Sequence, residues 1–202
     1  QNAFLKDNSQ LQIKVIGISN SRKMVFNENG INLESWRDDL LNSNDKADIS
    51  TFIEEMKTLN LSNTIFVDNT ANSAITSHYE KILDSSISIS TPNKIATSSA
   101  YLQYERLKYI AKKRGVQFLY ETNVGAGLPV ISTLNDLIQS GDRILKIEGV
   151  LSGSLSFIFN SFTEGVKFSS VVKQAKELGF TEPDPRTDLN GIDVRRKLII
   201  LA

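Results

Sequence analysis

Several residue types are scarce in this chain of 202 residues, and each shortage excludes a class of chemistry. The chain has no cysteine, so it has no disulfide framework, no thiolate metal site and no cysteine nucleophile. Such a composition suits a reducing compartment, and we expect a cytoplasmic location. The single histidine, His78, lies beside a helical stripe of apolar residues, and we interpret it as a helix-flank residue rather than a base or a metal ligand.

An excess of one charge is also missing, because 23 Lys and Arg residues balance 23 Asp and Glu residues. Without a basic surface, the chain lacks the usual signature of nucleic-acid binding or of attachment to anionic lipid. No apolar run approaches the ~18 residues that a membrane span requires, and the N-terminus has no signal-peptide pattern. We therefore expect a small-molecule substrate and no nucleic-acid or membrane partner. We also expect a homo-oligomer.

Two phosphate-binding patterns are incomplete. Gly125 and Gly127 begin a pattern like that of dinucleotide-binding turns, but Val130 stands where the third glycine would be. The glycine- and serine-rich stretch 149–154 has no Gly-Lys-Ser/Thr and is not a P-loop. The chain therefore contains no complete dinucleotide fingerprint.

The first part of the chain alternates between strand and helix patterns. Residues 11–18 are β-rich with few charges, which predicts a strand buried on both faces. Further strands are expected at 65–67, 87–89 and 117–120, and helices at 33–41 (with Asn32 as its cap), 52–59, 75–83 and 101–113. Strands that alternate with helices predict a parallel α/β sheet.

The pattern then changes. Residues 143–151 alternate between apolar and polar side chains, which predicts a half-exposed antiparallel strand. Helices are expected at 153–162 and at 170–178, the second capped by Ser169 or Ser170 and stopped by Gly179. The change predicts a second domain that starts between residues 90 and 125. An apolar helix without a stop signal at 197–202 leads us to expect that more chain follows.

The densest candidate for chemistry is the segment 179–197. Its two prolines hold a stretch with several acidic residues in an extended conformation, and a helix resumes after Gly191. Asp193 and Lys197 are spaced i and i+4 on that helix, so they share one face. Two interpretations are open: a solvated acidic loop with a surface ion pair, or a lysine partly buried among apolar neighbours that acts as a proton donor.

Two other segments follow predicted strands. Residues 121–129 combine Glu121 with small residues whose backbone can approach a ligand closely, which fits an alkali or alkaline-earth cation. The alternative is a tight strand-to-helix turn in which Pro129 opens the helix. Lys94 lies just after the strand at 87–89, where open α/β sheets place ligand contacts, although a solvated lysine is the alternative.

Four segments together resemble homoserine dehydrogenase, and in particular the form that is fused behind an aspartokinase. The segments are residues 91–96, 120–131, 151–159 and 179–197. The resemblance implies an α/β chain with an incomplete Rossmann-type NAD(P)-binding domain over residues 1–92, without its glycine-rich turn. An α+β catalytic domain would follow over residues 93–202, truncated at its C-terminal end. It also implies an aspartokinase domain in the same parent chain.

The activity implied by this resemblance is the reversible NAD(P)-dependent reduction of L-aspartate 4-semialdehyde to L-homoserine, on the path to threonine and methionine. By similarity Lys197 is the general acid, Asp193 orients it, and Lys94 is a second active-site lysine near the substrate and the nicotinamide. The residues implied to bind the substrate are Glu182, Asp188 and Ser154. The chain departs from the common family pattern at Phe180, Thr187 and Arg195, none of which is a proposed catalytic group.

The resemblance also implies cofactor and cation sites. Thr70 matches a cofactor-contact position. A monovalent cation, usually sodium, would be held by the carboxylate of Glu121 and the backbone carbonyls of Val124, Ala126 and Leu128.

The first predicted strand ends in a segment, residues 19–23, that has no acid to accept from a ribose 2′-hydroxyl. We therefore expect NADP in preference to NAD, with Arg22 as the partner of the 2′-phosphate and Lys23 as the alternative.

Two other functions remain open from the sequence. One is a related dehydrogenase that acts on another amino-acid aldehyde or ketone. The other is a non-catalytic fragment or assembly module.

Overall fold

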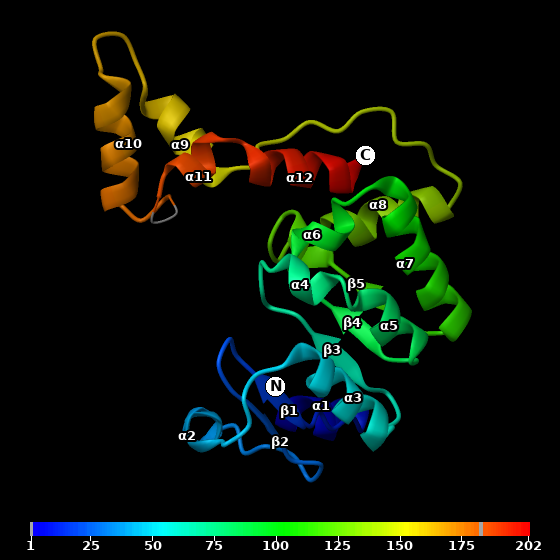
Figure 1. Cartoon of the computed structure of the whole chain (residues 1–202). Coiled ribbons are helices and arrows are strands. Elements are labelled where there is room, and N and C mark those ends of the chain that lie inside the picture. The colour runs from blue at the N-terminus through cyan, green and yellow to red at the C-terminus, as the bar shows by residue number, and fades with distance from the viewer. Residues whose placement is uncertain (1, 182–183) are drawn as a thin grey trace. The chain divides into compact units, whose positions relative to one another are not determined.

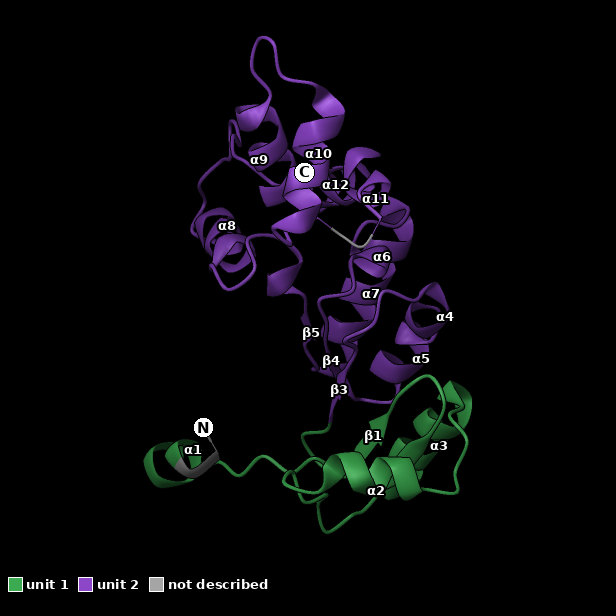
Figure 2. Cartoon of the chain, turned by 90° about the vertical axis from the view of Figure 1, so that its left-hand side faces the viewer, with its two compact units in different colours: residues 1–64 green, residues 65–202 purple. Residues whose placement is uncertain are grey.

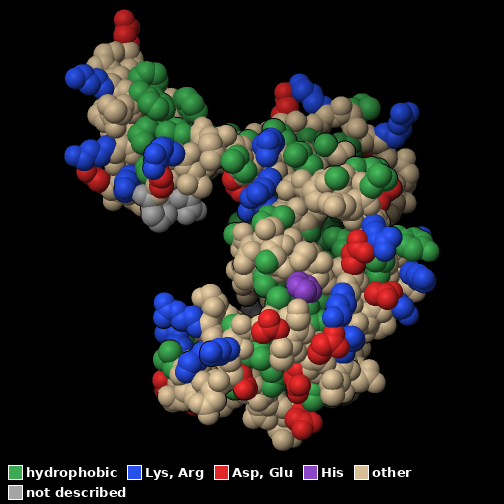
Figure 3. Space-filling view, in the orientation of Figure 1, with side chains coloured by type: hydrophobic (Ala, Val, Ile, Leu, Met, Phe, Trp, Pro, Cys, Tyr) green, Lys and Arg blue, Asp and Glu red, His purple; other side chains and the backbone are tan. Residues whose placement is uncertain are grey.

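The computed structural model describes residues 2–181 and 184–202, and it divides the chain into two compact units, Gln1–Thr64 and Ile65–Ala202 (Figures 1 and 2). The domain boundary predicted between residues 92 and 93 falls inside the second unit and stays a prediction. On the face shown in Figure 3, Lys and Arg side chains are interspersed with Asp and Glu side chains. In the described part of the chain, no helix combines the length and hydropathy that a membrane crossing requires.

The described residues of the first unit form three helices and a two-stranded antiparallel sheet. The elements are α1 (Asn2–Ser9), β1 (Gly17–Ser19), β2 (Met24–Phe26), α2 (Trp36–Asn42) and α3 (Ile49–Leu59). Ile18 of β1 lies opposite Val25 of β2. The core is formed by residues of β2, α2 and α3, among them the fully buried Ile53, and the rings of Phe26 and Phe52 are 4.5 Å apart.

The strand predicted at 11–18 is wrong in extent and burial. Regular pairing begins at Gly17, and β1 is half-buried to exposed rather than buried on both faces. A strand forms only where a neighbour completes its hydrogen bonds, and among the described residues β2 is the neighbour that does so. The Asn32 cap is also wrong: the Asn32 side chain accepts from the Glu34 amide, and α2 begins after Ser35.

The second unit opens with the predicted parallel sheet, whose strand order is β3 (Ile65–Val67), β4 (Ser88–Ser90), β5 (Phe118–Leu119). Both pairings are parallel, which confirms the α/β prediction. The helices around the sheet are α4 (Ser73–Thr76), α5 (Tyr79–Asp84), α6 (Lys94–Thr97) and α7 (Tyr101–Arg114). Ile82, Leu83 and Ile89 have no exposed surface, so the core lies between the sheet and α5.

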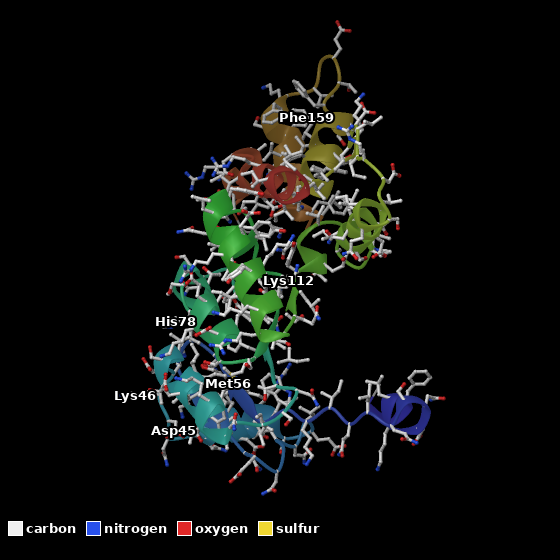
Figure 4. The ribbon with its side chains drawn as sticks, turned by 90° about the vertical axis from the view of Figure 1, so that its right-hand side faces the viewer. Asp45, Lys46, Met56, His78, Lys112 and Phe159 are labelled. Atoms are coloured by element: carbon white, nitrogen blue, oxygen red, sulfur yellow. The ribbon has the colours of Figure 1, made fainter. Side chains whose placement is uncertain are left out.

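The single helix predicted at 75–83 is two helices. Ser77 ends α4 and His78 begins α5 as its N-cap residue. Ser77 donates its hydroxyl to the carbonyl of Ala74, a local bond that competes with helix propagation. His78 is half-buried beside this break, as expected of a helix-flank residue (Figure 4).

After β5, the regular elements formed by the described residues of the second unit are all helices. Its elements are the 3₁₀ helix η1 (Glu121–Asn123) and the helices α8 (Val130–Gln139), α9 (Gly153–Ser161), α10 (Phe168–Glu177), α11 (Arg186–Leu189) and α12 (Ile192–Leu201). Ile158 of α9 packs against Val171 and Ala175 of α10. As predicted, Gly179 stops α10 in a left-handed conformation with φ of 74°.

Two details differ from the sequence predictions. Residues 142–152 form no strand, and Leu145 is 93% exposed. An alternating pattern makes a strand only when a neighbouring strand pairs with it, and no described residue does so here. The predicted cap at Ser169 or Ser170 is wrong because Lys167 precedes the first residue of α10, and Ser170 donates to the Lys167 carbonyl instead.

Candidate active site

Two lysines and one aspartate meet where α6 and α12 lie side by side (Figure 1). Lys197 Nζ lies 2.7 Å from Asp193 Oδ2, and Lys94 Nζ lies 3.3 Å from Asp193 Oδ1. Asp193 and Lys197 belong to one face of α12, as their spacing predicts, whereas Lys94 is the first residue of α6. The fold thus brings together three residues from the two segments that carry the proposed catalytic groups.

Burial distinguishes this cluster from an ordinary surface ion pair. The side chain of Lys197 is 19% exposed and that of Lys94 is 25% exposed. Elsewhere in the chain the same i, i+4 spacing joins Lys173 to Glu177, but those groups are 3.8 Å apart and mostly exposed. Lys197 also donates to the carbonyl of Leu151 at 2.7 Å. The solvated interpretation therefore does not describe Lys197.

The charges of the cluster act on Asp193. Burial raises the pKa of Asp193, but the hydrogen bond from Lys197 and the positive charges of Lys94 and Lys197 together outweigh burial and hold that pKa below its ordinary value. Asp193 therefore stays ionised at neutral pH. With two ammonium groups on one carboxylate, the cluster keeps an excess of positive charge, which favours a developing negative oxygen nearby.

Thr70 and Lys94 follow adjacent parallel strands, β3 and β4, and so belong to the same edge of the sheet. In open α/β sheets this carboxyl edge is where ligands bind. Thr70 is exposed, and its amide donates to Asp68 at 2.8 Å. Its hydroxyl lies 3.5 Å from the side-chain amide of Asn93, the residue before Lys94. The predicted cofactor contact and the second lysine thus lie on one edge.

Glu121 lies in the loop for which the sequence left two interpretations open. Its two carboxylate oxygens accept from the amides of Ile131 and Ser132, each at 2.8 Å, so it caps the first turn of α8. Pro129 directly precedes that helix, as the strand-to-helix turn predicted. A cation role is compatible with this geometry, because a carboxylate oxygen has a second lone pair.

The backbone of the same loop turns sharply. Gly125 and Ala126 have positive φ values, 82° and 52°, and a side chain on Gly125 would clash with Val130. The carbonyl of Leu128 accepts from the amide of Val130 at 2.9 Å. Among the described residues, no group of three or more His, Cys, Asp or Glu side chains is arranged to hold a metal ion.

The other predicted residues are spread over several elements. Ser154 lies in the first turn of α9 and Asp188 in α11, and both are half-buried. Glu182 lies outside the described residues. Arg22 and Lys23 belong to the first unit, where their amides donate to the side chain of Asn20 in the turn between β1 and β2.

Three residues near Lys94 received no role from the sequence. Asp68, Tyr79 and Asn123 are buried, and each directs a polar group toward the segment 91–97. A sequence signal existed for Asp68, because it directly follows a buried strand at the ligand-binding edge. Tyr79 gave no such signal, since its position in the apolar stripe of α5 conceals its hydroxyl.

Comparison with known proteins decides the family. The family model "Homoserine dehydrogenase, NAD binding domain" matches residues 2–121, and the model "Homoserine dehydrogenase" matches residues 129–202. The chain belongs to the homoserine dehydrogenase family. Its fold is accordingly an α/β fold with an NAD-binding domain followed by a homoserine dehydrogenase domain, as the sequence predicted.

Individual relatives include fused and single-function members of the family. The chain is 46% identical to bifunctional aspartokinase/homoserine dehydrogenase 2 of Arabidopsis thaliana, and the match covers 100% of this chain and 22% of the relative. It is 45% identical to homoserine dehydrogenase of Schizosaccharomyces pombe, and the match covers 85% of this chain and 47% of the relative. A solved structure of a hyperthermophilic archaeal homoserine dehydrogenase with NADPH is 27% identical in sequence and has a TM-score of 0.78. The match covers 99% of this chain and 63% of that one. The chain thus spans about a fifth of the fused relative and about half of the fission-yeast enzyme.

Proposed function

We propose that this chain carries the active site of an NAD(P)-dependent homoserine dehydrogenase, which interconverts L-aspartate 4-semialdehyde and L-homoserine. The observation that carries the proposal is the cluster in which Lys94 and Lys197 share the carboxylate of Asp193. The cluster supplies a partly buried proton donor close to the sheet edge at which an α/β protein binds its ligands. The family membership supplies the reaction.

Lys197 is the proton donor in this proposal. An ammonium group has three N–H donors, and Lys197 directs two of them to Asp193 and the Leu151 carbonyl. The third is available to the aldehyde oxygen of the substrate. As that oxygen gains negative charge during reduction, Lys197 gives it a proton, and in the reverse direction the amine takes the proton from the hydroxyl. A bound nicotinamide cofactor supplies or accepts the hydride.

Lys94 and the acidic side chains divide the remaining tasks. Lys94 adds a second positive charge near the developing oxygen, and Asp193 holds both ammonium groups in place. The ammonium group of the amino-acid substrate would be received by Glu182 and Asp188, and Ser154 would donate or accept a hydrogen bond on the substrate side. These assignments rest on the resemblance and on the half-buried positions of Asp188 and Ser154.

The cofactor is proposed to be NADP, with Thr70 as a cofactor contact and Lys94 near the nicotinamide. Arg22 is exposed, and its guanidinium has no ion-pair partner among the described residues. By contrast, the Lys23 ammonium donates to the carbonyl of Leu41. This difference favours Arg22 as the group that binds a 2′-phosphate, because it need not give up an existing partner.

The cation is proposed to be sodium, held by Glu121 and the carbonyls of Val124, Ala126 and Leu128. All of these donors are hard oxygens with one negative charge among them, which fits a monovalent ion better than a transition metal. When bound, the ion would fix the loop between η1 and α8.

The parent protein and its setting are also proposals. Relatives of this chain are fused to an aspartokinase, and we propose that this chain is the dehydrogenase part of such a protein. We further propose that the protein forms a homo-oligomer, that it acts in threonine and methionine biosynthesis, and that it is cytoplasmic.

The test is an assay of the intact protein for oxidation of NADPH with L-aspartate 4-semialdehyde and with other amino-acid aldehydes and ketones. We expect turnover with L-aspartate 4-semialdehyde to exceed that with every other carbonyl compound. Preference for another compound would establish a dehydrogenase of different specificity. No turnover with any of them would establish a non-catalytic module.

A further inference from the structure

The buried polar side chains of the described residues gather around one short segment. Apart from the hydroxyl of Tyr79, they are those of Asp68, Thr91, Asn93, Thr97 and Asn123, each at most 4% exposed. Three of them belong to the segment 91–97 itself, and the other two contact it from β3 and η1. At the centre of this segment is Lys94. Buried polar groups that are all satisfied fix a local geometry, because every alternative leaves one of them without a partner.

Asp68 is the central acceptor of this network. One carboxyl oxygen accepts from the Thr70 amide at 2.8 Å. The other accepts from the Tyr79 hydroxyl at 2.6 Å and from the Asn93 side-chain amide at 3.0 Å. Burial, followed by the hydrogen bond to Asp68, raises the pKa of Tyr79, so its hydroxyl keeps its proton and is the donor.

Asn93 transmits this arrangement to Lys94. While its side-chain amide donates to Asp68, its side-chain oxygen accepts from the Ile95 amide at 3.1 Å and so caps the short helix α6. The backbone amide of Asn93 also donates to the Thr91 hydroxyl, which itself donates to the carbonyl of Asp68. Both sides of Asn93 are therefore tied to the end of β3, and Lys94 follows it directly.

Asn123 holds the other side of the segment. In the orientation that satisfies both of its side-chain atoms, its amide donates to the carbonyls of Thr91 and Pro92 at 3.1 and 2.9 Å. Its oxygen accepts from the Thr97 hydroxyl at 2.7 Å. The residues on both sides of Lys94 are thus held by buried hydrogen bonds, while the lysine side chain itself extends to Asp193.

We propose that Asp68 and Tyr79 are positioning residues, which hold Lys94 at Asp193 through Asn93. This inference rests on the proposed function, in which Lys94 acts on the substrate. Tyr79 is the informative residue, because its hydroxyl has no hydrogen bond to α6 or α12. It lies 2.6 Å from Asp68 Oδ2 and 3.1 Å from Thr91 Oγ1. Both of those groups accept a hydrogen bond from Asn93, the residue before Lys94. Removing that hydroxyl leaves the Asp68 oxygen with one donor fewer and loosens the segment.

The first test is a double-mutant cycle in the intact protein. Tyr79→Phe is expected to lower kcat about 10- to 100-fold when Lys94 is present, the range for a small misplacement of a reacting group. In a Lys94→Ala background the same substitution should change kcat by less than about twofold, because its effect passes through Lys94. The matched control is Tyr109→Phe, which removes an exposed hydroxyl of α7 and should leave kcat unchanged.

The cycle separates positioning from stability. The melting temperature should fall by the same amount on Tyr79→Phe in both backgrounds, since the lost hydrogen bond is the same. Equal losses of kcat in both backgrounds would overturn the proposal, because a structural effect alone is additive.

A second readout does not depend on turnover. The rate at which an amine-reactive reagent labels Lys94 is measured by mass spectrometry against that of the exposed Lys112 on α7 (Figure 4). Tyr79→Phe should raise the relative labelling of Lys94, because its ammonium leaves Asp193 more often. Unchanged labelling would overturn the positioning role even in a protein that turns over no substrate, whereas raised labelling without turnover would refute only the proposed function.

Discussion

Asp193 illustrates how a residue acquires its role from what surrounds it. It is itself half exposed, yet it contacts two lysines that are mostly buried, and their charges keep it ionised. Losing Asp193 would leave two ammonium groups close together without a counterion. The proposed site therefore depends on a carboxylate that would form no part of the reacting bond.

Lys197→Ala is expected to lower kcat of the intact enzyme by ~10²–10⁴, the range of a positioned general acid, with a smaller effect on the KM of the semialdehyde. The physical reason is that the developing alkoxide then has no partly buried donor. The matched control is Lys173→Ala, which removes a lysine of the same i, i+4 type from an exposed pair. Steady-state kinetics of both variants measure the difference. An unaltered kcat in Lys197→Ala would remove Lys197 from the chemistry.

At this scale the sequence predicted the partnership of Asp193 and Lys197, because i, i+4 spacing on a helix fixes which side chains are neighbours. The ion pair confirms it. The sequence alone could not predict that the Leu151 carbonyl accepts a hydrogen bond from Lys197, because a backbone contact with a distant segment leaves no signal in residue types. The Tyr79 hydroxyl was missed for a similar reason, because tyrosine fits an apolar stripe as well as phenylalanine does.

Among the elements, α8 depends on a residue from outside it. Both carboxylate oxygens of Glu121 accept hydrogen bonds from backbone amides in the first turn of α8. Glu121 therefore caps the helix in place of Pro129, whose side chain has no acceptor. The positive end of the helix dipole also stabilises the negative charge of this carboxylate. Glu121 therefore has a structural role whether or not a cation binds.

Glu121→Ala is expected to have two separable effects. It should destabilise the protein by about 1–3 kcal/mol, because two helix amides lose an acceptor. It should also abolish the response of activity to sodium that we expect of the wild-type protein in titrations with sodium, potassium and zinc. The control is Asp48→Ala, which removes the carboxylate cap of α3 and should cost stability without altering the sodium response. Zinc-specific activation of the wild type would contradict the sodium assignment.

Elements with strong local signals were predicted well. The structure confirms the helix predicted at 101–113, which extends to Arg114 and ends at Gly115, and the helix predicted at 52–59, which has a periodic apolar face. The strand predicted at 143–151 is wrong. Alternating apolar and polar side chains show only that the segment could form a half-buried strand. The strand needs a pairing partner, and the described residues offer none.

At the scale of the whole molecule, the alternation of strands and helices was sufficient to predict a parallel α/β sheet. Periodicity could not predict the antiparallel β1–β2 pair, because pairing direction depends on which segments meet in space. The residues proposed for proton transfer all belong to the second unit, whereas Arg22 belongs to the first. We therefore expect that substitutions can alter cofactor preference and proton transfer independently.

Arg22→Ala is expected to raise the KM for NADPH about 10- to 100-fold and to leave the KM for NADH nearly unchanged. The reason is that a 2′-phosphate accepts a charge-assisted hydrogen bond from a guanidinium, worth ~1.5–3 kcal/mol, and a 2′-hydroxyl does not need it. Lys23→Ala is the control in the same turn. Its ammonium already has the Leu41 carbonyl as an acceptor, so its removal should affect the two cofactors alike. The KM values of both cofactors, measured at one salt concentration, decide between these residues. A selective loss of NADPH binding in Lys23→Ala would move the phosphate contact to Lys23, and equal losses for both cofactors in Arg22→Ala would show that Arg22 does not distinguish NADP from NAD.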